Sequence, residues 1–178
     1  DWRDMIHRFD AIGGGVAQYH YGIDKQRTRK HIARDGGSVE DRIYLGGYEL
    51  YRRRNTQREV VEEIESHHLF EGEQRVLLVD DVLQAREQPG PSRISLTERT
   101  CWRYQYGKHL ASVGLELDES ARVISYEEFH PYGTSAYRLM NEDAAVRAPV
   151  KRYRHTGMER DEESGLNYCE ARFSEHAI

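Results

Sequence analysis

The feature of this 178-residue sequence that most limits its fold is a local pattern that recurs four times along the chain. In each copy an aromatic or aliphatic run leads into a turn rich in Gly, Asp or Glu, and a basic or aliphatic run follows. The copies span residues 19–29, 42–51, 69–79 and 113–126. Two short runs joined by such a turn are typical of a β-hairpin, because Gly and Asp accept the backbone angles of a tight turn. The sequence therefore predicts a mainly β fold of antiparallel hairpins.

The last copy also shows the alternation of a strand with one buried face. Within residues 113–118, Val and Leu occupy every second position, and Gly, Glu and Asp occupy the positions between. Tyr supplies 12 aromatic residues, against 4 Phe and 2 Trp, and Tyr suits a pleated, half-buried surface. Degenerate units repeated every few tens of residues indicate that each hairpin buries its apolar side against its neighbours. We therefore expect the hairpins to stack into a curved β-strip.

Three other segments are less clear. Residues 56–68 are rich in Glu and fit either a helix or a charged strand, and we favour the strand because β-branched residues dominate the apolar positions. Residues 135–148 are rich in Ala and are followed by Pro149, which predicts a short helix or a loop. Residues 84–95 contain Pro-Gly-Pro and are expected to form an exposed loop. No boundary is visible, so we expect residues 1–178 to form a single unit.

The charge pattern argues against some classes of partner. The formal net charge is -5, whereas phosphate binding needs a basic surface, so no nucleic-acid partner is expected. Basic runs at 27–30 and 52–54 are balanced by acidic runs at 62–63 and 159–163, and we expect all four to be solvated strand faces.

No apolar stretch approaches the roughly 20 residues of a membrane helix, so no membrane span is expected. The first residues lack an initiating Met and a signal-peptide layout, which predicts a cut inside a longer chain.

Two pairs of adjacent residues could carry chemistry. They are Asp80-Asp81 and His67-His68. Adjacent strand residues point to opposite faces of a sheet, so neither pair is expected to share one ligand. We predict that the two aspartates lie in a turn or on a solvated strand, and that the histidines are ordinary strand-face residues.

Glycines, cysteines and the other histidines give no cofactor or metal motif. Residues 13–15 and 46–47 are glycines without the spacing of a phosphate-binding loop, so turns or bulges are expected. Cys101 and Cys169 lack the paired base of a nucleophile and are predicted to be buried thiols, with one long-range disulfide as the open alternative. We predict no cofactor and no metal, including at three histidines whose spacing does not support a zinc site: His109, His130 and His155.

The last third of the chain carries three ordered motifs. They read Arg-Tyr-Gln-Tyr-Gly-Lys-His-Leu-Ala-Ser at 103–112, Ile-Ser-Tyr-Glu-Glu-Phe-His-Pro-Tyr-Gly-Thr at 124–134, and Lys-Arg-Tyr-Arg-His-Thr-Gly-Met-Glu-Arg-Asp-Glu-Glu-Ser-Gly-Leu at 151–166. Together they resemble the Rhs repeat-associated core, in the form found in the C component of insecticidal Tc toxin complexes. The resemblance covers most of residues 19–172 and is strongest over residues 102–173.

This resemblance implies a long β-strip of YD repeats that spirals into a hollow shell around a C-terminal toxin polypeptide. The implied partners are the remaining parts of the Rhs or Tc toxin shell and its toxin cargo, and the implied location is secreted or associated with a toxin complex. The tetrapeptide His-Pro-Tyr-Gly at 130–133 is expected to form a corner of the strip. An isolated piece of such a strip exposes unpaired strand edges, so we also expect homo-association through those edges.

The chain departs from this family after Phe173. The family houses an aspartyl autoprotease whose motif is of the type Gly-Arg-Phe/Trp-Leu-Ser-x-Asp-Pro, and no Asp-Pro follows here. The resemblance assigns Arg172 to the family's Arg, but Arg172 has no downstream Asp as a catalytic partner. A proteolytic dyad needs two carboxylates that share a proton, so we predict no catalysis by this chain alone.

Several positions also depart from the repeat pattern itself. Lys25, Ala121 and Glu170 stand where the YD turn usually has Gly, which predicts positive φ angles with a strain of about 1 kcal/mol or more at each. Three further residues replace usual tyrosines, and they are Asn167, Cys169 and Ser174. These changes predict a truncated or decaying copy, or an excised fragment.

Three hypotheses about function follow from the sequence. The first is a structural shell module that encapsulates a toxin polypeptide and has no chemistry of its own. The second is a remnant of the aspartyl autoprotease, completed by a partner chain that supplies the missing Asp-Pro segment. The third is a cell-surface module that binds carbohydrate or protein through exposed tyrosines.

Overall fold

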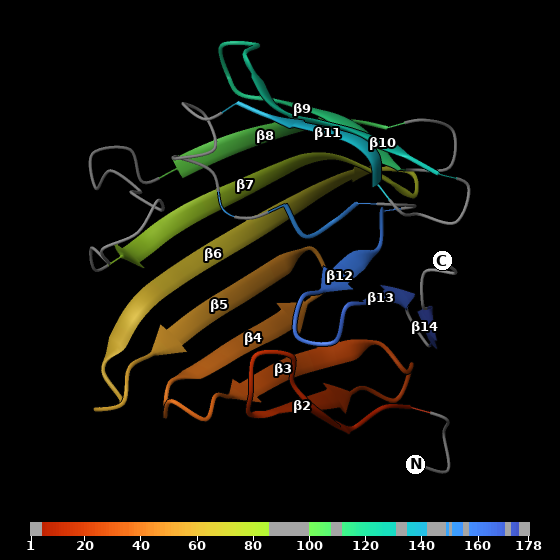
Figure 1. The fold of residues 1–178 in the computed structure, drawn as a ribbon. Coiled ribbons are helices and arrows are strands. Elements are labelled where there is room, and N and C mark those ends of the chain that lie inside the picture. The colour runs from red at the N-terminus through yellow and green to blue at the C-terminus, as the bar shows by residue number, and fades with distance from the viewer. Residues whose placement is uncertain are drawn as a thin grey trace.

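The computed structural model describes residues 5–85, 100–107, 112–130, 135–141, 149, 151–154, 157–169 and 172–174. Eleven strands form one antiparallel sheet in the order of the sequence, from β1 to β11 (Figure 1). A second, three-stranded sheet is formed by β12 to β14. The strands of the large sheet are β1 (Arg8–Asp10), β2 (Val16–Tyr21), β3 (Arg27–Ala33), β4 (Val39–Leu45), β5 (Tyr48–Arg54), β6 (Val60–Glu71), β7 (Gln74–Ala85), β8 (Thr100–Gly107), β9 (Val113–Leu117), β10 (Val123–Phe129) and β11 (Ser135–Met140).

Each strand of the large sheet pairs with its neighbours in the chain, so the predicted stack of antiparallel hairpins is confirmed. The four predicted hairpins correspond to the pairs β2–β3, β4–β5, β6–β7 and β9–β10. The sheet does not close, because β1 and β11 stand at its two ends. Apart from residues 86–99 between β7 and β8, connections of at most five residues join neighbouring strands of this sheet, which is why turn residues predicted the hairpins.

The sheet curves, and the small sheet lies on its inner side (Figure 1). The small sheet consists of β12 (Glu159–Asp161), β13 (Leu166–Cys169) and β14 (Arg172–Ser174). We call the described residues from 151 to 174 the C-terminal segment. Backbone hydrogen bonds join this segment to the large sheet next to β1 and at β9: Ile12 N donates to Glu163 O at 2.8 Å, and Val113 N donates to Arg154 O at 3.1 Å. We call the face of the large sheet toward this segment the inner face, and the opposite face the outer face.

Two turns adopt the strained geometry that the sequence predicted. Lys25 has φ 64° and Ala121 has φ 59°, and both replace the glycine of the repeat pattern. Gly13, Gly14 and Gly15 also have positive φ, as expected for a turn. A Cβ on Gly15 would lie 2.1 Å from Ala33 O, so this close approach of two backbones requires glycine.

The prediction for residues 135–148 is wrong over its first part. Residues 135–140 form strand β11, which pairs with β10 instead of forming a helix or a loop. Every residue of β11 is exposed, so apolar and polar residues do not alternate between a buried and an exposed face. The pairing with β10 therefore decides the structure of this segment. Residues 142–148 lie outside the described part of the chain, as do residues 86–95 of the predicted loop, whose first two residues instead end strand β7. The predicted strand over residues 56–68 is confirmed by β6.

The burial of the strands differs from a simple apolar pattern. One small cluster beneath β1 to β3 is apolar, and it contains Ala11, Ala17, Tyr19 and Ile32. In β9, by contrast, the alternation is present but the fully buried side chain is Glu116, with 0% exposure, while Leu115 and Leu117 are only half-buried. The inner face is therefore buried mainly by polar contacts with the C-terminal segment. No helix in the described residues is long and apolar enough to cross a membrane.

Candidate functional site

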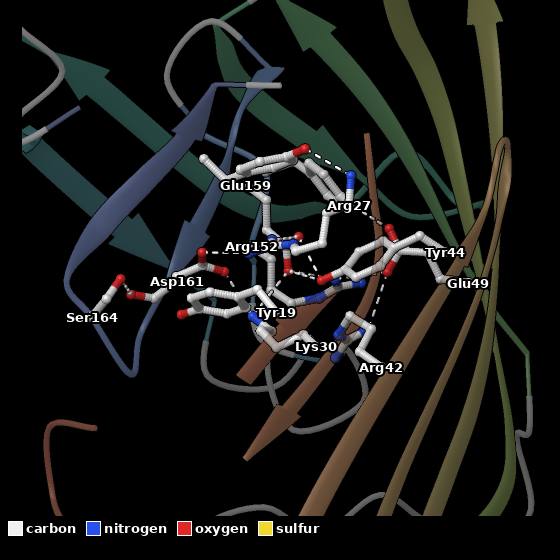
Figure 2. A network of polar contacts seen from close by, with 12 residues as sticks. Tyr19, Arg27, Lys30, Arg42, Tyr44, Glu49, Arg152, Glu159, Asp161 and Ser164 are labelled. Atoms are coloured by element: carbon white, nitrogen blue, oxygen red, sulfur yellow. Dashed lines mark hydrogen bonds and ion pairs between the residues drawn. The ribbon is translucent and has the colours of Figure 1, made fainter. Parts of the chain in front are cut away.

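The inner face carries a buried cluster of charged residues, shown in Figure 2, which we call the first cluster. Its cations come from β3, β4 and the stretch before β12, and its carboxylates come from β5 and from β12 and the turn that follows. Each end of the sequence thus supplies both cations and carboxylates, and the cluster joins β3, β4 and β5 to Arg152, β12 and the turn after β12. Its members are Arg27, Lys30, Arg42, Glu49, Arg152, Glu159, Asp161 and Glu163.

Arg27 and Lys30 join β3 to β12. Arg27 donates to Asp161 and Glu159 at 2.6 Å each, and Lys30 Nζ donates to Asp161 Oδ1 at 2.8 Å. Both cations are buried. Burial would lower the pKa of Lys30, but the neighbouring carboxylates outweigh it and raise that pKa. Both side chains therefore remain charged, and they hold the C-terminal segment against β3.

A β-bulge explains how two residues three apart reach the same face. The pairing of β2 with β3 shifts register between His20 and Tyr21, so Thr28 is an extra residue in β3. Tyr19 faces Lys30 and Tyr21 faces Arg27 in this register. Residues two apart in a strand share a face, so the partners of Tyr19 and Tyr21 share the inner face as well.

Glu49 forms the second half of the first cluster. Its carboxylate accepts hydrogen bonds from the Tyr153 hydroxyl, from Arg42 Nη1 at 3.1 Å and from Arg152 Nη1 at 2.8 Å. His68 Nε2 lies 3.0 Å from Glu49 Oε1. Burial would raise the pKa of Glu49, but Arg152, His68 and Arg42 outweigh burial and hold this pKa well below its usual range. A buried carboxylate with this many donors is an anchor for cations and a poor proton donor.

A second cluster lies beneath β7 to β10. Arg103 Nη2 donates to both oxygens of Glu116 at 3.0 Å, and Arg103 Nη1 lies 3.3 Å from Asp80 Oδ2. Ser125 Oγ donates to Glu116 Oε2 at 2.7 Å. Burial would raise the pKa of Glu116, but Arg103 and Lys151 outweigh it and lower that pKa to about 2. Glu116 is therefore ionised over the physiological range of pH.

Lys151 connects the second cluster to the C-terminal segment. Its ammonium donates to Val113 O at 2.7 Å and lies 3.5 Å from Glu127 Oε2. The residue is 2% exposed. The stretch 151–154 therefore continues the same covering role over β9 and β10 that β12 has over β3.

The prediction that the charge runs are solvated strand faces is wrong for two of the four runs. Arg27 and Lys30 of the first basic run are buried against carboxylates of the run at 159–163, about 130 residues later in the chain. The other two runs pair with each other across β5 and β6, where Arg53 Nε donates to Glu62 Oε2 at 2.9 Å and both side chains are partly exposed. Sequence reasoning could not foresee the first pairing, because no local signal brings residues so far apart together.

The two adjacent pairs are separated as predicted, but Asp80 is not solvated. Asp80 is 1% exposed, accepts a hydrogen bond from Ser66 Oγ at 2.5 Å and belongs to the second cluster. Asp81 instead accepts a hydrogen bond from Thr100 Oγ1 at the exposed end of β7. Asp80 thus contradicts the turn or solvated-strand prediction, because Arg103 neutralises it inside the fold.

The candidate histidines and the cysteine side chain that the structure describes have different surroundings. His67 is exposed and packs against the ring of Tyr48, with 5.3 Å between ring centroids, whereas the His68 side chain is buried beside Glu49. His130 is exposed, and the other two candidate histidines, His109 and His155, lie outside the described residues. The structure describes no group of three His, Cys, Asp or Glu residues that could hold a metal ion.

Cys101 is a half-buried free thiol, and burial raises its pKa to about 11. A thiol with this pKa is a weak nucleophile at neutral pH. Arg172 begins β14, and its backbone pairs with Cys169. The side chains of Arg172 and Cys169 lie outside what the structure describes, so the role that the resemblance gives Arg172 stays a prediction.

The outer face has a different character. Arg103 and Gln105 of β8 are buried on the inner face, so the residues that alternate with them along the strand point outward. Trp102, Tyr104 and Tyr106 form an exposed row there, which we call the outer aromatic row, and they are 40%, 37% and 56% exposed. The rings of Trp102 and Tyr104 stack, with 6.5 Å between centroids.

The sequence analysis did not single out Glu49, Glu116, Lys151 or Arg152 as site residues. For two of them a signal existed, because Lys151 and Arg152 open the third motif, at 151–166. Glu49 and Glu116 carried no signal beyond an acidic residue within a strand, which is usually solvated.

Comparison with known proteins gives one relative in sequence and several in structure. No family model matches the chain. Toxin subunit YenC1 of Yersinia entomophaga is 38% identical over 71 residues, which cover 40% of this chain and 7% of that protein. A crystal structure of TcdB2-TccC3-TEV superposes with a TM-score of 0.80 and 23% identity, over 97% of this chain and 8% of that chain. A Photorhabdus luminescens Tc holotoxin pore with a variant TccC3 gives a TM-score of 0.73 and 23% identity, over 96% of this chain and 8% of that chain.

These matches confirm the resemblance to the C component of Tc toxins, in sequence over 71 residues and in fold over nearly the whole chain. This chain corresponds to less than a tenth of the length of each of these proteins. It has the fold of one part of a much longer protein.

Proposed function

We propose that this chain, with its Tc-toxin-like sequence and fold, serves as a wall piece in the β-shell of a toxin complex and encapsulates part of a toxin polypeptide. The observation that carries the proposal is the superposition on TcdB2-TccC3-TEV over 97% of the chain. A curved, open sheet whose two end strands are each paired on one side only suits such a role, because neighbouring hairpins can extend it at both edges.

The proposed partners are the upstream and downstream pieces of the same shell, together with its cargo. The test is size-exclusion chromatography with light scattering of the chain alone and after co-expression with those pieces. A stoichiometric complex is the expected result. Homo-association of the chain alone is expected to weaken when the pieces are present, because both would compete for the edge strands β1 and β11.

A matched pair of variants makes this test specific. Arg138→Pro places proline in the exposed edge strand β11, which pairs with β10 alone in the sheet. Asn141 N donates to Ile124 O of β10, and backbone groups alternate in direction along a strand, so the N–H of Arg138 points to the free edge. Proline at this position removes that outward donor and blocks pairing of an added strand. Ile23→Pro, at an exposed position in the turn between β2 and β3, is the control. The proposal fails if the chain stays a monomer with all pieces, or if the control disrupts assembly as strongly as Arg138→Pro does.

We further propose that the chain has no catalytic activity of its own. Neighbouring cations hold the pKa values of Glu49 and Glu159 below their usual range and lower that of Glu116 to about 2, so these carboxylates do not resemble a pair that shares one proton. The alternative is an autoprotease remnant that a partner completes. Mixing the chain with a C-terminal fragment that carries an Asp-Pro motif tests it, and cleavage that Arg172→Ala abolishes would support the remnant.

The outer aromatic row favours one other function, binding of a carbohydrate surface. Exposed aromatic rings in a row present apolar faces with polar hydroxyl tips. Binding to a glycan array that falls in a Trp102→Ala, Tyr106→Ala double variant, while a Tyr137→Ala control on β11 still binds, would support this function. Equal binding by both variants would remove it.

A further inference from the structure

With the neighbouring Arg75 included, the first cluster has one more positive charge than its carboxylates can neutralise. Its five cations are Arg27, Lys30, Arg42, Arg152 and the neighbouring Arg75, and its four carboxylates are Glu49, Glu159, Asp161 and Glu163. Arg27, Lys30, Arg42 and Arg152 each have a carboxylate within ion-pair distance. Among the residues that the structure describes, Arg75 has none.

Arg75 is also the least satisfied of these cations. It is 8% exposed, and its Nε and Nη1 are buried without a hydrogen-bond partner in the described structure. Its guanidinium lies over the ring of Tyr153, with 3.6 Å from Cζ to the ring centroid, and 5.4 Å from the centroid of Phe70. Burial lowers the pKa of Arg75. An aromatic face attracts a cation but leaves the N–H groups in the guanidinium plane without acceptors.

The nearby carboxylates have no capacity left for Arg75. Glu49 already accepts from Tyr153, Arg42 and Arg152, and His68 lies beside it. Glu159 accepts from Arg27, Lys30, Arg152 and Tyr44. A carboxylate offers about four lone-pair sites, so both groups are saturated.

We propose that Arg75 is a binding site for a carboxylate brought from outside this chain's described residues, either a free carboxylate or an acidic side chain of a polypeptide laid on the inner face. A carboxylate supplies two acceptor oxygens in the plane of the guanidinium, which matches the N–H groups that Tyr153 leaves free. It also supplies the one negative charge that the first cluster lacks. The aromatic rings of Tyr153 and Phe70 hold the guanidinium in place, and because Nε and Nη1 are buried, neighbouring side chains must shift to admit the carboxylate. This site goes beyond the proposed shell function and does not depend on it.

The test measures thermal unfolding of the full chain in sodium acetate and in sodium chloride of equal ionic strength. A ligand that binds only the native state raises Tm, by about 3 to 6 °C at ten times its Kd for a domain of this size. The wild-type chain should show this rise in acetate over chloride. Arg75→Met should lose it and should match or exceed the wild-type Tm in chloride, because an unpaired buried charge has been removed.

Two further variants separate the site from general anion effects. Arg75→Lys keeps the charge but loses the planar pair of donors, so the preference for acetate over chloride should fall. Arg122→Met removes a cation whose side chain is 62% exposed, and it should leave the preference unchanged.

A pair of peptides distinguishes the source of the carboxylate. Acetyl-Gly-Glu-Gly-amide and acetyl-Gly-Gln-Gly-amide are compared with acetate by the same Tm shift. A rise with the Glu peptide at a concentration at least tenfold below that of acetate indicates an acidic side chain of a polypeptide, and equal potency indicates a free carboxylate. The proposal is overturned if acetate and chloride give the same Tm for the wild-type chain, or if Arg75→Met keeps the full response to acetate.

Discussion

The two faces of the large sheet are built on opposite principles. The inner face carries charged side chains and is buried, because the C-terminal segment covers it and supplies counter-charges. On the outer face of β8, by contrast, Trp102, Tyr104 and Tyr106 are exposed. Hydrophobicity alone would have assigned the two faces of β8 the other way round. The difference shows that burial in this fold is set by which face has a covering segment.

Breaking the inner face should give the largest effect. In the native fold the Arg27 guanidinium lies 2.6 Å from a carboxylate oxygen of Glu159 and 2.6 Å from one of Asp161. Arg27→Met leaves both carboxylates without this closest buried donor. Removing one partner of a buried pair typically costs about 3 to 5 kcal/mol, so the free energy of unfolding in urea should fall by that amount. Arg29→Met is the matched control, because Arg29 lies two residues away and is 46% exposed beside Asp41. An exposed pair contributes less than about 1 kcal/mol. Equal losses in both variants would contradict the contrast between faces.

The second cluster predicts how stability depends on pH. The folded pKa of Glu116 is about 2, below its ordinary value of 4.5, so its contribution is fully present above pH 4.5 and is lost as pH falls toward 2. Urea unfolding measured between pH 6 and pH 2.5 should show this decline, and Glu116→Gln should flatten it. A decline of the same slope in Glu116→Gln would mean that other carboxylates dominate.

The turns offer a gain in stability. Lys25 has φ 64° at a position where the repeat pattern has Gly, so Lys25→Gly should raise the free energy of unfolding by about 1 kcal/mol. Gln26→Gly is the control, since Gln26 does not have positive φ and should gain nothing. Urea unfolding of the two variants decides the point, and a loss in Lys25→Gly would show that this turn is not strained.

The outer face should respond least. Tyr106 is 56% exposed, so Tyr106→Ala should change the free energy of unfolding by less than about 1 kcal/mol. Thermal unfolding checks this directly. A loss as large as that of Arg27→Met would indicate that a further segment covers the outer row.

The hairpins could be predicted from the sequence because their signals are local. The glycines at 46–47 and the runs around them are enough to specify β4 and β5, and the positive φ of Lys25 and Ala121 followed from the repeat pattern. Strand β11 could not be predicted this way, because all of its residues are exposed and its neighbour β10 decides its structure.

The charge clusters could not be predicted, for two physical reasons. The bulge at Thr28 changes which residues of β3 face inward, and it depends on the register with β2. The acidic partners of Arg27 and Lys30 lie about 130 residues away, where no periodicity connects them. The motif at 151–166 marked the covering segment as unusual, but the side chains that it meets came only from the structure.

The most direct test of this account is a double-mutant cycle between Arg27 and Asp161, measured by urea unfolding. The two residues are 134 positions apart and join the sheet to the segment that covers it through one 2.6 Å contact. The account predicts that Arg27→Met and Asp161→Asn are coupled by about 2 kcal/mol, within the range seen for residues in direct contact. Additive losses, with a coupling near zero, would contradict the claim that buried charge pairing holds the C-terminal segment on the inner face.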